Sequence, residues 1–125
     1  MIFGVGTDIV AIKRVGRLYG RHGERALEKL LAPSERAGFD KTTDPARFLA
    51  KRFAAKEALG KALGIGVAKP ATLPNIAVVH DTLGKPSFAY AADLAQFLDE
   101  RGLSAHLSIS DEQDFALAFV VLERA

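Results

Sequence analysis

The spacing of apolar and polar positions changes along the chain, and each spacing predicts an element. Residues 2–12 form a β-branched, apolar run that Gly4 and Gly6 interrupt, which predicts a buried strand with a close backbone approach. Cations spaced one helical turn apart predict a helix over 13–21, and a second short helix is predicted over 24–31. The chain is therefore expected to begin with a strand followed by helices.

A break and a long helix come next. The run Pro33-Ser34-Glu35 marks the break, with Ser34 as the candidate N-cap. The clearest helical pattern covers 45–63, where Asp44 is a good N-cap and Pro45 suits the first helical position. Gly64 is typical of the residue that ends a helix. The core face predicted for this helix holds Phe48, Ala55, Leu59, Ala62 and Leu63.

The second half of the chain predicts two hairpins separated by a helix. The predicted elements are strands over 75–80 and 86–90, a helix over 91–101, and strands over 104–110 and 115–122. The resulting order, β-α-α-α-β-β-α-β-β, predicts a single α+β domain over 1–125. An antiparallel sheet is expected to pack against the long central helix.

Composition narrows the class of protein. The chain has 125 residues, of which 49% are hydrophobic and 26% charged, which fits one domain with one core. The absence of cysteine excludes disulfides and thiolate metal sites and fits a reducing compartment. No apolar run reaches the ~18 residues of a membrane span, and the N-terminus lacks the order of a signal peptide. We expect a cytoplasmic protein with no membrane partner.

Charge is informative through its distribution. The net charge of +2, with a pI near 9.0, is too small to argue for nucleic acid. Cations nevertheless crowd the first predicted helices, where Arg14, Arg17 and Arg21 would share one helical face. Such a patch would steer an acidic partner, and a solvated helix face is the alternative.

The central helix carries polar residues away from its predicted core face. Glu57 and Lys61 lie one turn apart, beside the small residues Ala50 and Ala54. An exposed ion pair, worth only ~0.2–0.5 kcal/mol, would explain this spacing alone. Arg52 and Lys56 also lie one turn apart with no carboxylate between them, so an anion such as phosphate is expected there unless both head groups extend into water.

Asp8 supplies the second half of a candidate site. A carboxylate among Val5, Ile9 and Val10 needs a partner if it is buried. Asp8 and Glu57 together would give two oxygen ligands, which is what Mg²⁺ takes beside waters and substrate phosphate. Zinc is disfavoured because the three histidines, His22, His80 and His106, show no ligand spacing.

Three stretches together resemble a known family. They are Gly4-Val-Gly-Thr-Asp-Ile-Val10, the central stretch Arg47 to Gly64 with its Lys-Glu-Ala core, and Gly84-Lys-Pro86. The chain is similar over nearly its whole length to the small 4′-phosphopantetheinyl transferases of the holo-(acyl-carrier-protein) synthase type. The strand over 115–122 also fits the end of that family's sequences.

The resemblance implies an activity. Such enzymes move the 4′-phosphopantetheine arm of coenzyme A onto a serine of apo-acyl carrier protein and release adenosine 3′,5′-bisphosphate, in support of fatty acid biosynthesis. They use Mg²⁺ and typically form homotrimers with active sites between subunits. The acidic carrier would also be the partner of Arg14, Arg17 and Arg21.

The resemblance also assigns residues. Asp8 and Glu57 would bind Mg²⁺, and Lys61 would lie near the diphosphate, so these three are the expected catalytic residues. Glu57, directly or through a water on the metal, is the candidate general base. Coenzyme A would contact Arg52, Lys56, Lys61, Lys85 and Pro86.

One position departs from the family. Many relatives carry histidine near coenzyme A where this chain has Asp111, after Ser108-Ile-Ser110. A carboxylate would repel phosphate, so Asp111 is expected to accept a hydrogen bond from ribose or adenine, or to lie beside a cation.

Two other functions compete with a phosphopantetheinyl transferase. A module that binds single-stranded RNA would use some of the eight phenylalanines, but no predicted strand interleaves aromatics with cations. A different Mg²⁺-dependent enzyme acting on a nucleotide would share the metal site without needing a protein acceptor.

Overall fold

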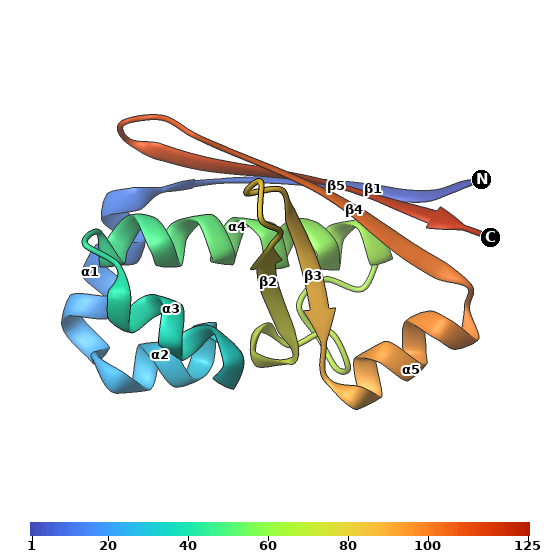
Figure 1. The fold of residues 1–125 in the computed structure, drawn as a ribbon, viewed down its shortest axis with the longest axis horizontal. Helices are drawn as coiled ribbons and strands as arrows, with labels where there is room; N and C mark the ends of the chain where they lie inside the picture. The colour runs from blue at the N-terminus through green and yellow to red at the C-terminus, as the bar shows by residue number, and fades with distance from the viewer.

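The long helix predicted over 45–63 lies at the centre of the molecule. In the computed structural model, which describes residues 1–125, α4 (Pro45–Leu63) runs along one face of a three-stranded antiparallel sheet (Figure 1). The strands are β1 (Ile2–Ala11), β5 (Phe115–Arg124) and β4 (Leu103–Asp111), in that order across the sheet. The predicted α+β class, with an antiparallel sheet against a central helix, is confirmed.

The remaining elements cover the other side of α4. Three helices lie near its first turns, and a two-stranded antiparallel hairpin crosses its middle (Figure 1). The helices are α1 (Ile12–His22), α2 (Glu24–Leu30) and α3 (Arg36–Lys41), the hairpin is β2 (Ile76–His80) and β3 (Pro86–Tyr90), and α5 (Ala92–Glu100) precedes β4. Short 3₁₀ turns, η1 (Pro33–Glu35) and η2 (Leu73–Asn75), complete the order.

The ends of α4 follow their local sequence. An Asp44 side-chain oxygen accepts a hydrogen bond from the Arg47 backbone N–H at 3.2 Å, and Pro45 occupies the first helical position. Gly64 ends the helix with a φ of 83°, which favours glycine. The predicted single apolar sector is wrong, because α4 is buried on several sides between the sheet, the helices and the hairpin.

The contact between β1 and α4 is made backbone to backbone. A Cβ added at Gly4 would overlap the carbonyl oxygen of Ala62, and one added at Gly6 would overlap that of Ala58. The close approach predicted for this strand is therefore confirmed. Because side chains two apart on a strand share a face, Asp8 points toward α4 like the two glycines.

The segment between α2 and α4 differs from the sequence prediction in two ways. The helix α3 was not predicted, and Ser34 is not an N-cap. The Glu35 side chain instead accepts a hydrogen bond from the Ala32 backbone N–H at 2.8 Å. Glu35 is buried, so this turn is fixed by contacts across the fold that a local pattern does not contain.

The face of the sheet that points away from α4 is apolar and open. It exposes large hydrophobic side chains from both β1 and β5, among them Val5, Ile9, Phe115, Leu117 and Phe119. A group of exposed large hydrophobic side chains on one sheet face is typical of a protein–protein contact. None of the helices combines the length and the apolar character that crossing a membrane requires.

Candidate active site

Asp8 and Lys61 meet where β1 passes the last turns of α4. Lys61 Nζ donates hydrogen bonds to Asp8 Oδ1 at 3.1 Å and to the Thr7 carbonyl oxygen at 2.9 Å. The Asp8 side chain is 16% exposed, so it is sheltered but reachable from solvent. These two residues, far apart in sequence, come together as predicted.

Glu57 belongs to the same group of charges. Burial raises the pKa of Glu57, the neighbouring Asp8 carboxylate raises it further, and Lys61 and Arg14 act in the opposite direction. The two carboxylates therefore interact repulsively, and a cation shared between them would relieve the repulsion. Glu57 lies one turn before Lys61 on α4, which places it near the Asp8–Lys61 pair, and its role as a metal ligand stays a prediction.

The oxygen donors of this site fit magnesium. No group of three or more His, Cys, Asp or Glu side chains in the molecule could hold a metal on its own. Mg²⁺ is commonly held by one or two carboxylates and completes its shell with waters and substrate phosphate. Asp8 and Glu57 match that pattern.

The prediction that Lys56 binds coenzyme A is wrong. Its side chain is fully buried, and Nζ donates to the Glu35 carboxylate and to the Leu30 carbonyl oxygen at 2.7 Å. An anion does lie beside Arg52 and Lys56, as the spacing required, but it is Glu35 of the same chain. Two unpaired cations at the edge of a core were the only sequence signal for this buried carboxylate.

Arg52 is held less completely than Lys56. Its Nε lies 3.0 Å from Glu35 Oε2, and its guanidinium stacks 3.8 Å from the centre of the Phe48 ring. Burial lowers the pKa of Arg52, while Glu35 offsets part of that effect. Part of the side chain still reaches solvent. A contact between Arg52 and coenzyme A stays a prediction.

Asp111 is paired with cations. Its Oδ2 accepts a hydrogen bond from Arg47 Nη1 at 2.7 Å, and Lys51 Nζ lies 3.8 Å from Oδ1. The same Arg47 nitrogen donates to the Glu112 carbonyl oxygen, so this arginine fastens the β4–β5 turn to the start of α4. Of the two roles expected for Asp111, a place beside a cation is confirmed, and contact with coenzyme A stays a prediction.

The turn that contains Lys85 lies between β2 and β3. Asp81 Oδ1 accepts hydrogen bonds from the Leu83 and Lys85 backbone N–H groups, both at 2.9 Å, and these bonds lower the pKa of Asp81. Pro86 opens β3 opposite His80. These contacts fix the turn's shape.

The pKa of His80 is affected by the cations that lie near this turn. Burial lowers the pKa of His80, and the positive charges of Arg52 and Lys51 lower it further. The hairpin therefore lies close to cations of α4. Sequence reasoning assigned no role to Lys51 or His80, because only the crossing of the hairpin over α4 brings them together.

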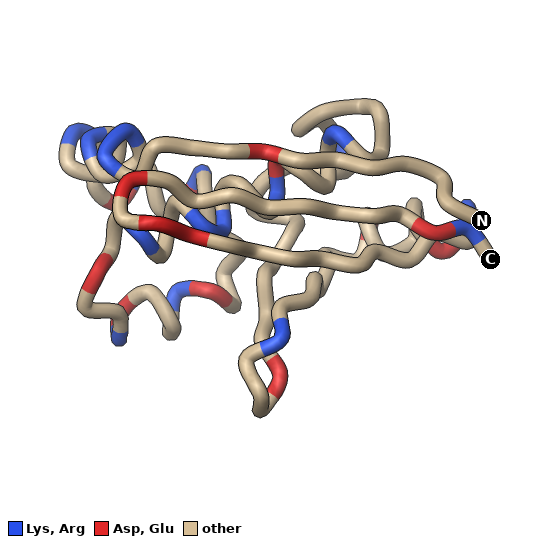
Figure 2. The backbone as a smooth tube through the Cα atoms, turned by 90° about the horizontal axis from the view of Figure 1, so that it is seen from above, with Lys and Arg blue, Asp and Glu red and all other residues tan.

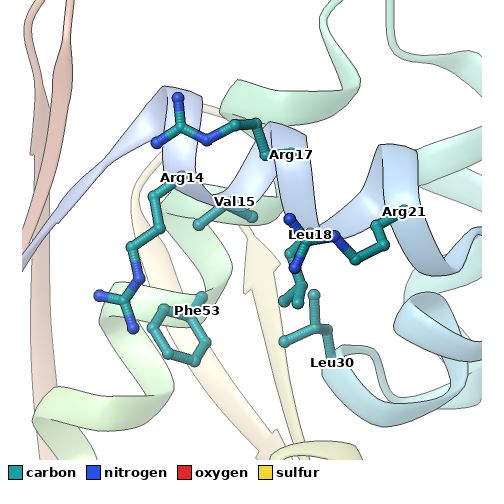
Figure 3. A pocket seen from close by; sticks show the side chains of 7 residues that line it. All are labelled: Arg14, Val15, Arg17, Leu18, Arg21, Leu30 and Phe53. Atoms are coloured by element: carbon teal, nitrogen blue, oxygen red, sulfur yellow. The ribbon is translucent and has the colours of Figure 1, made fainter.

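The three predicted carrier-binding arginines line one pocket. Arg14, Arg17 and Arg21 project from α1 around an opening of about 280 Å³ (Figure 3). Its apolar lining comes from three helices: Val15 and Leu18 from α1, Leu30 from α2 and Phe53 from α4. Figure 2 shows Lys and Arg gathered at this end of the molecule. Phe53, which lines the pocket, lies one turn before Glu57 on α4, so the pocket adjoins the carboxylate site.

Comparisons with known proteins place the chain in a family. The model of the 4′-phosphopantetheinyl transferase superfamily matches residues 4–120. A protein named holo-[acyl-carrier-protein] synthase from Aromatoleum aromaticum is 62% identical over 124 residues, which cover 99% of each chain. One of the same name from Dechloromonas aromatica is 59% identical over the full length of both chains.

Solved structures show the same fold. The crystal structure of the holo-[acyl-carrier-protein] synthase from Neisseria meningitidis superposes with a TM-score of 0.96 at 47% identity, covering 99% of this chain and 100% of that one. The Helicobacter pylori enzyme, solved in complex with coenzyme A, gives 0.82 at 30% identity, over 95% of this chain and 99% of that one.

Proposed function

Because the chain belongs to the 4′-phosphopantetheinyl transferase superfamily, we propose that it is a holo-(acyl-carrier-protein) synthase. It transfers the 4′-phosphopantetheine of coenzyme A to a serine of apo-acyl carrier protein and releases adenosine 3′,5′-bisphosphate, which supports fatty acid biosynthesis. The observation that carries this proposal is that Asp8, Glu57 and Lys61 meet beside the arginine-lined pocket. A phosphate-handling site and a docking surface for a protein acceptor thus lie side by side.

Mg²⁺ is the proposed cofactor, held by Asp8 and Glu57. The donor set supports it, because two carboxylates that repel each other accept a hard cation readily. When bound, Mg²⁺ would neutralise phosphate charge and act as a Lewis acid. We place the reaction in the cytoplasm, where coenzyme A and carrier would be available.

The remaining chemistry falls to the side chains. In the transfer, the serine oxygen bonds to phosphorus, the diphosphate bond to adenosine 3′,5′-bisphosphate breaks, and the serine gives up its proton. Glu57 is the proposed acceptor of that proton, directly or through a water; because a carboxylate on a metal is a weak base, the route through water is preferred. Lys61 is exposed enough to stabilise the charge that develops on the leaving bisphosphate. Arg52, Lys85, Pro86 and Asp111 are proposed contacts of coenzyme A.

Intact-mass spectrometry of the carrier tests the proposed function. Apo-carrier mixed with the protein, coenzyme A and Mg²⁺ should gain the mass of one phosphopantetheine, and chelation of the metal should stop the gain. Glu57→Gln should lower turnover by at least about 10²-fold while its circular dichroism stays that of the folded protein. An unmodified carrier, or normal turnover by Glu57→Gln with Mg²⁺, would contradict the assignment.

The arginine-lined pocket is the proposed docking surface for the carrier. Its cations suit an acidic protein, and its apolar lining would give a docked partner surface to bury. Long-range attraction by such a patch speeds association and is screened by salt. Arg14, Arg17 and Arg21 are therefore proposed to act on the carrier and not on coenzyme A.

Reversal of one of these charges separates the two substrates. Arg14→Glu should raise KM for the carrier by about tenfold and leave KM for coenzyme A unchanged, since only the carrier is drawn to the patch. The effect should shrink as salt rises. Lys41→Glu makes the same charge change on α3, away from the pocket, and serves as the control. Equal losses for both substrates with Arg14→Glu would rule out a selective carrier contact.

A homotrimer is the proposed assembly. The open apolar face of the sheet supports it, because aromatic and aliphatic side chains of β1 and β5 lie exposed there in one chain. Copies of the chain that pack through this face would remove these side chains from water.

Sedimentation velocity tests the assembly. The mass obtained from sedimentation should be about three times the chain mass of 13.4 kDa. Phe119→Asp should lower the measured mass toward that of a single chain, because a carboxylate is costly to bury in an apolar contact. Leu83→Asp, which changes an exposed leucine in the β2–β3 turn, should leave the trimer intact. A wild-type protein that sediments as a single chain would exclude the trimer.

A further inference from the structure

Lys56 has a buried ammonium that the proposed chemistry does not use. Nζ donates to three acceptors from different segments: the Glu35 carboxylate, the Leu30 carbonyl oxygen at 2.7 Å and the Leu73 carbonyl oxygen at 3.2 Å. All three donor positions of the ammonium are therefore filled. Leu30 is the last residue of α2, where carbonyl groups lack helical partners, so Lys56 caps that helix from α4.

Glu35 extends the connection to a further element. Its Oε1 accepts from the Ala32 backbone N–H, and its Oε2 accepts from the Val78 backbone N–H at 3.0 Å. The pair of Lys56 and Glu35 thus joins α4 to the end of α2, to η1, to η2 and to β2. The helix layer that carries α1 and α2 is held to the central helix by these bonds as well as by apolar packing.

The balance of charge shows that Lys56 is not needed to neutralise Glu35. One carboxylate faces two cations, because Arg52 Nε also lies 3.0 Å from Glu35 Oε2. Removal of Lys56 would leave Glu35 and Arg52 as a matched pair. A buried ion pair contributes little net stability relative to apolar residues, so a geometric role explains the lysine better than a stabilising one.

The position of Lys56 connects the two halves of the proposed site. It follows Phe53 by three residues and directly precedes Glu57 on α4. Its acceptor Leu30 forms a wall of the arginine-lined pocket, whose α4 side is Phe53. The Lys56 side chain therefore fixes the wall contributed by α2 relative to the helix that carries both Phe53 and Glu57. Figure 3 shows Leu30 and Phe53, the two walls that it connects.

We propose that Lys56 is a positioning residue for the carrier protein. By holding the C-terminal end of α2 against α4, it sets the width of the arginine-lined pocket and aligns a docked carrier with Glu57. We expect coenzyme A binding not to depend on this tether, because Lys56 donates only to Leu30, Glu35 and Leu73, none of which is a proposed contact of coenzyme A. The inference rests on the proposed function for the identity of the docked partner.

Lys56→Met in the full-length protein tests the proposal, because methionine keeps most of the length of the side chain and removes the donors. KM for apo-carrier should rise by about tenfold, and calorimetric affinity for apo-carrier without coenzyme A should fall by the same factor. KM for coenzyme A should stay within about twofold. Leu98→Ala, a core truncation in α5 away from the pocket, controls for lost stability and should leave both KM values unchanged.

Hydrogen exchange gives a readout that needs no turnover. Amides over 27–31 should exchange faster in Lys56→Met than in Leu98→Ala, because only the former frees the end of α2. An unchanged carrier KM in a folded Lys56→Met protein, equal rises in both KM values, or the same carrier defect in Leu98→Ala would overturn the proposal. Unchanged exchange over 27–31 would overturn it too. If the wild-type protein modifies no carrier, the proposed function fails, and the exchange comparison still decides whether Lys56 holds α2.

Discussion

The close contact between β1 and α4 is the constraint on which the candidate site depends. Gly4 and Gly6 let the strand lie directly against the backbone of the helix at Ala58 and Ala62. No side chain fits between them, so the distance between the two elements is set by backbone atoms, which yield little. Asp8, two residues after Gly6, then faces the helix that carries the other charged residues of the site. Two glycines thereby hold a carboxylate where a lysine and a second carboxylate can meet it.

Local chemistry made most of the fold predictable. The N-cap at Asp44, the glycine that ends α4 and the alternation of the late strands are short-range signals, and each element they predict is present. The segment around Glu35 was not predictable, because its turn is held by bonds to Lys56 and to β2 that join residues distant in sequence. The division of the strands into two sheets also depends on contacts that no single segment encodes.

In the site, too, some contacts could be predicted from the sequence and others depend on residues that only the fold brings together. The sequence indicated that a sheltered Asp8 requires a partner, and the structure identifies Lys61 as one such partner. The two clustered cations did indicate an anion beside them, but their spacing could not identify that anion as Glu35. Likewise, the cation beside Asp111 is Arg47, which only the packing of the β4–β5 turn on α4 reveals.

Comparison of two glycine variants tests the central constraint most directly. Gly6→Ala should lower the free energy of unfolding by ~1–3 kcal/mol and reduce transfer per folded molecule, because a Cβ must push β1 and Asp8 away from α4. Gly20→Ala, in a helix where nothing crowds the added carbon, should leave activity unchanged and stability equal or higher. A Gly6→Ala protein as stable and as active as the wild type would contradict the account.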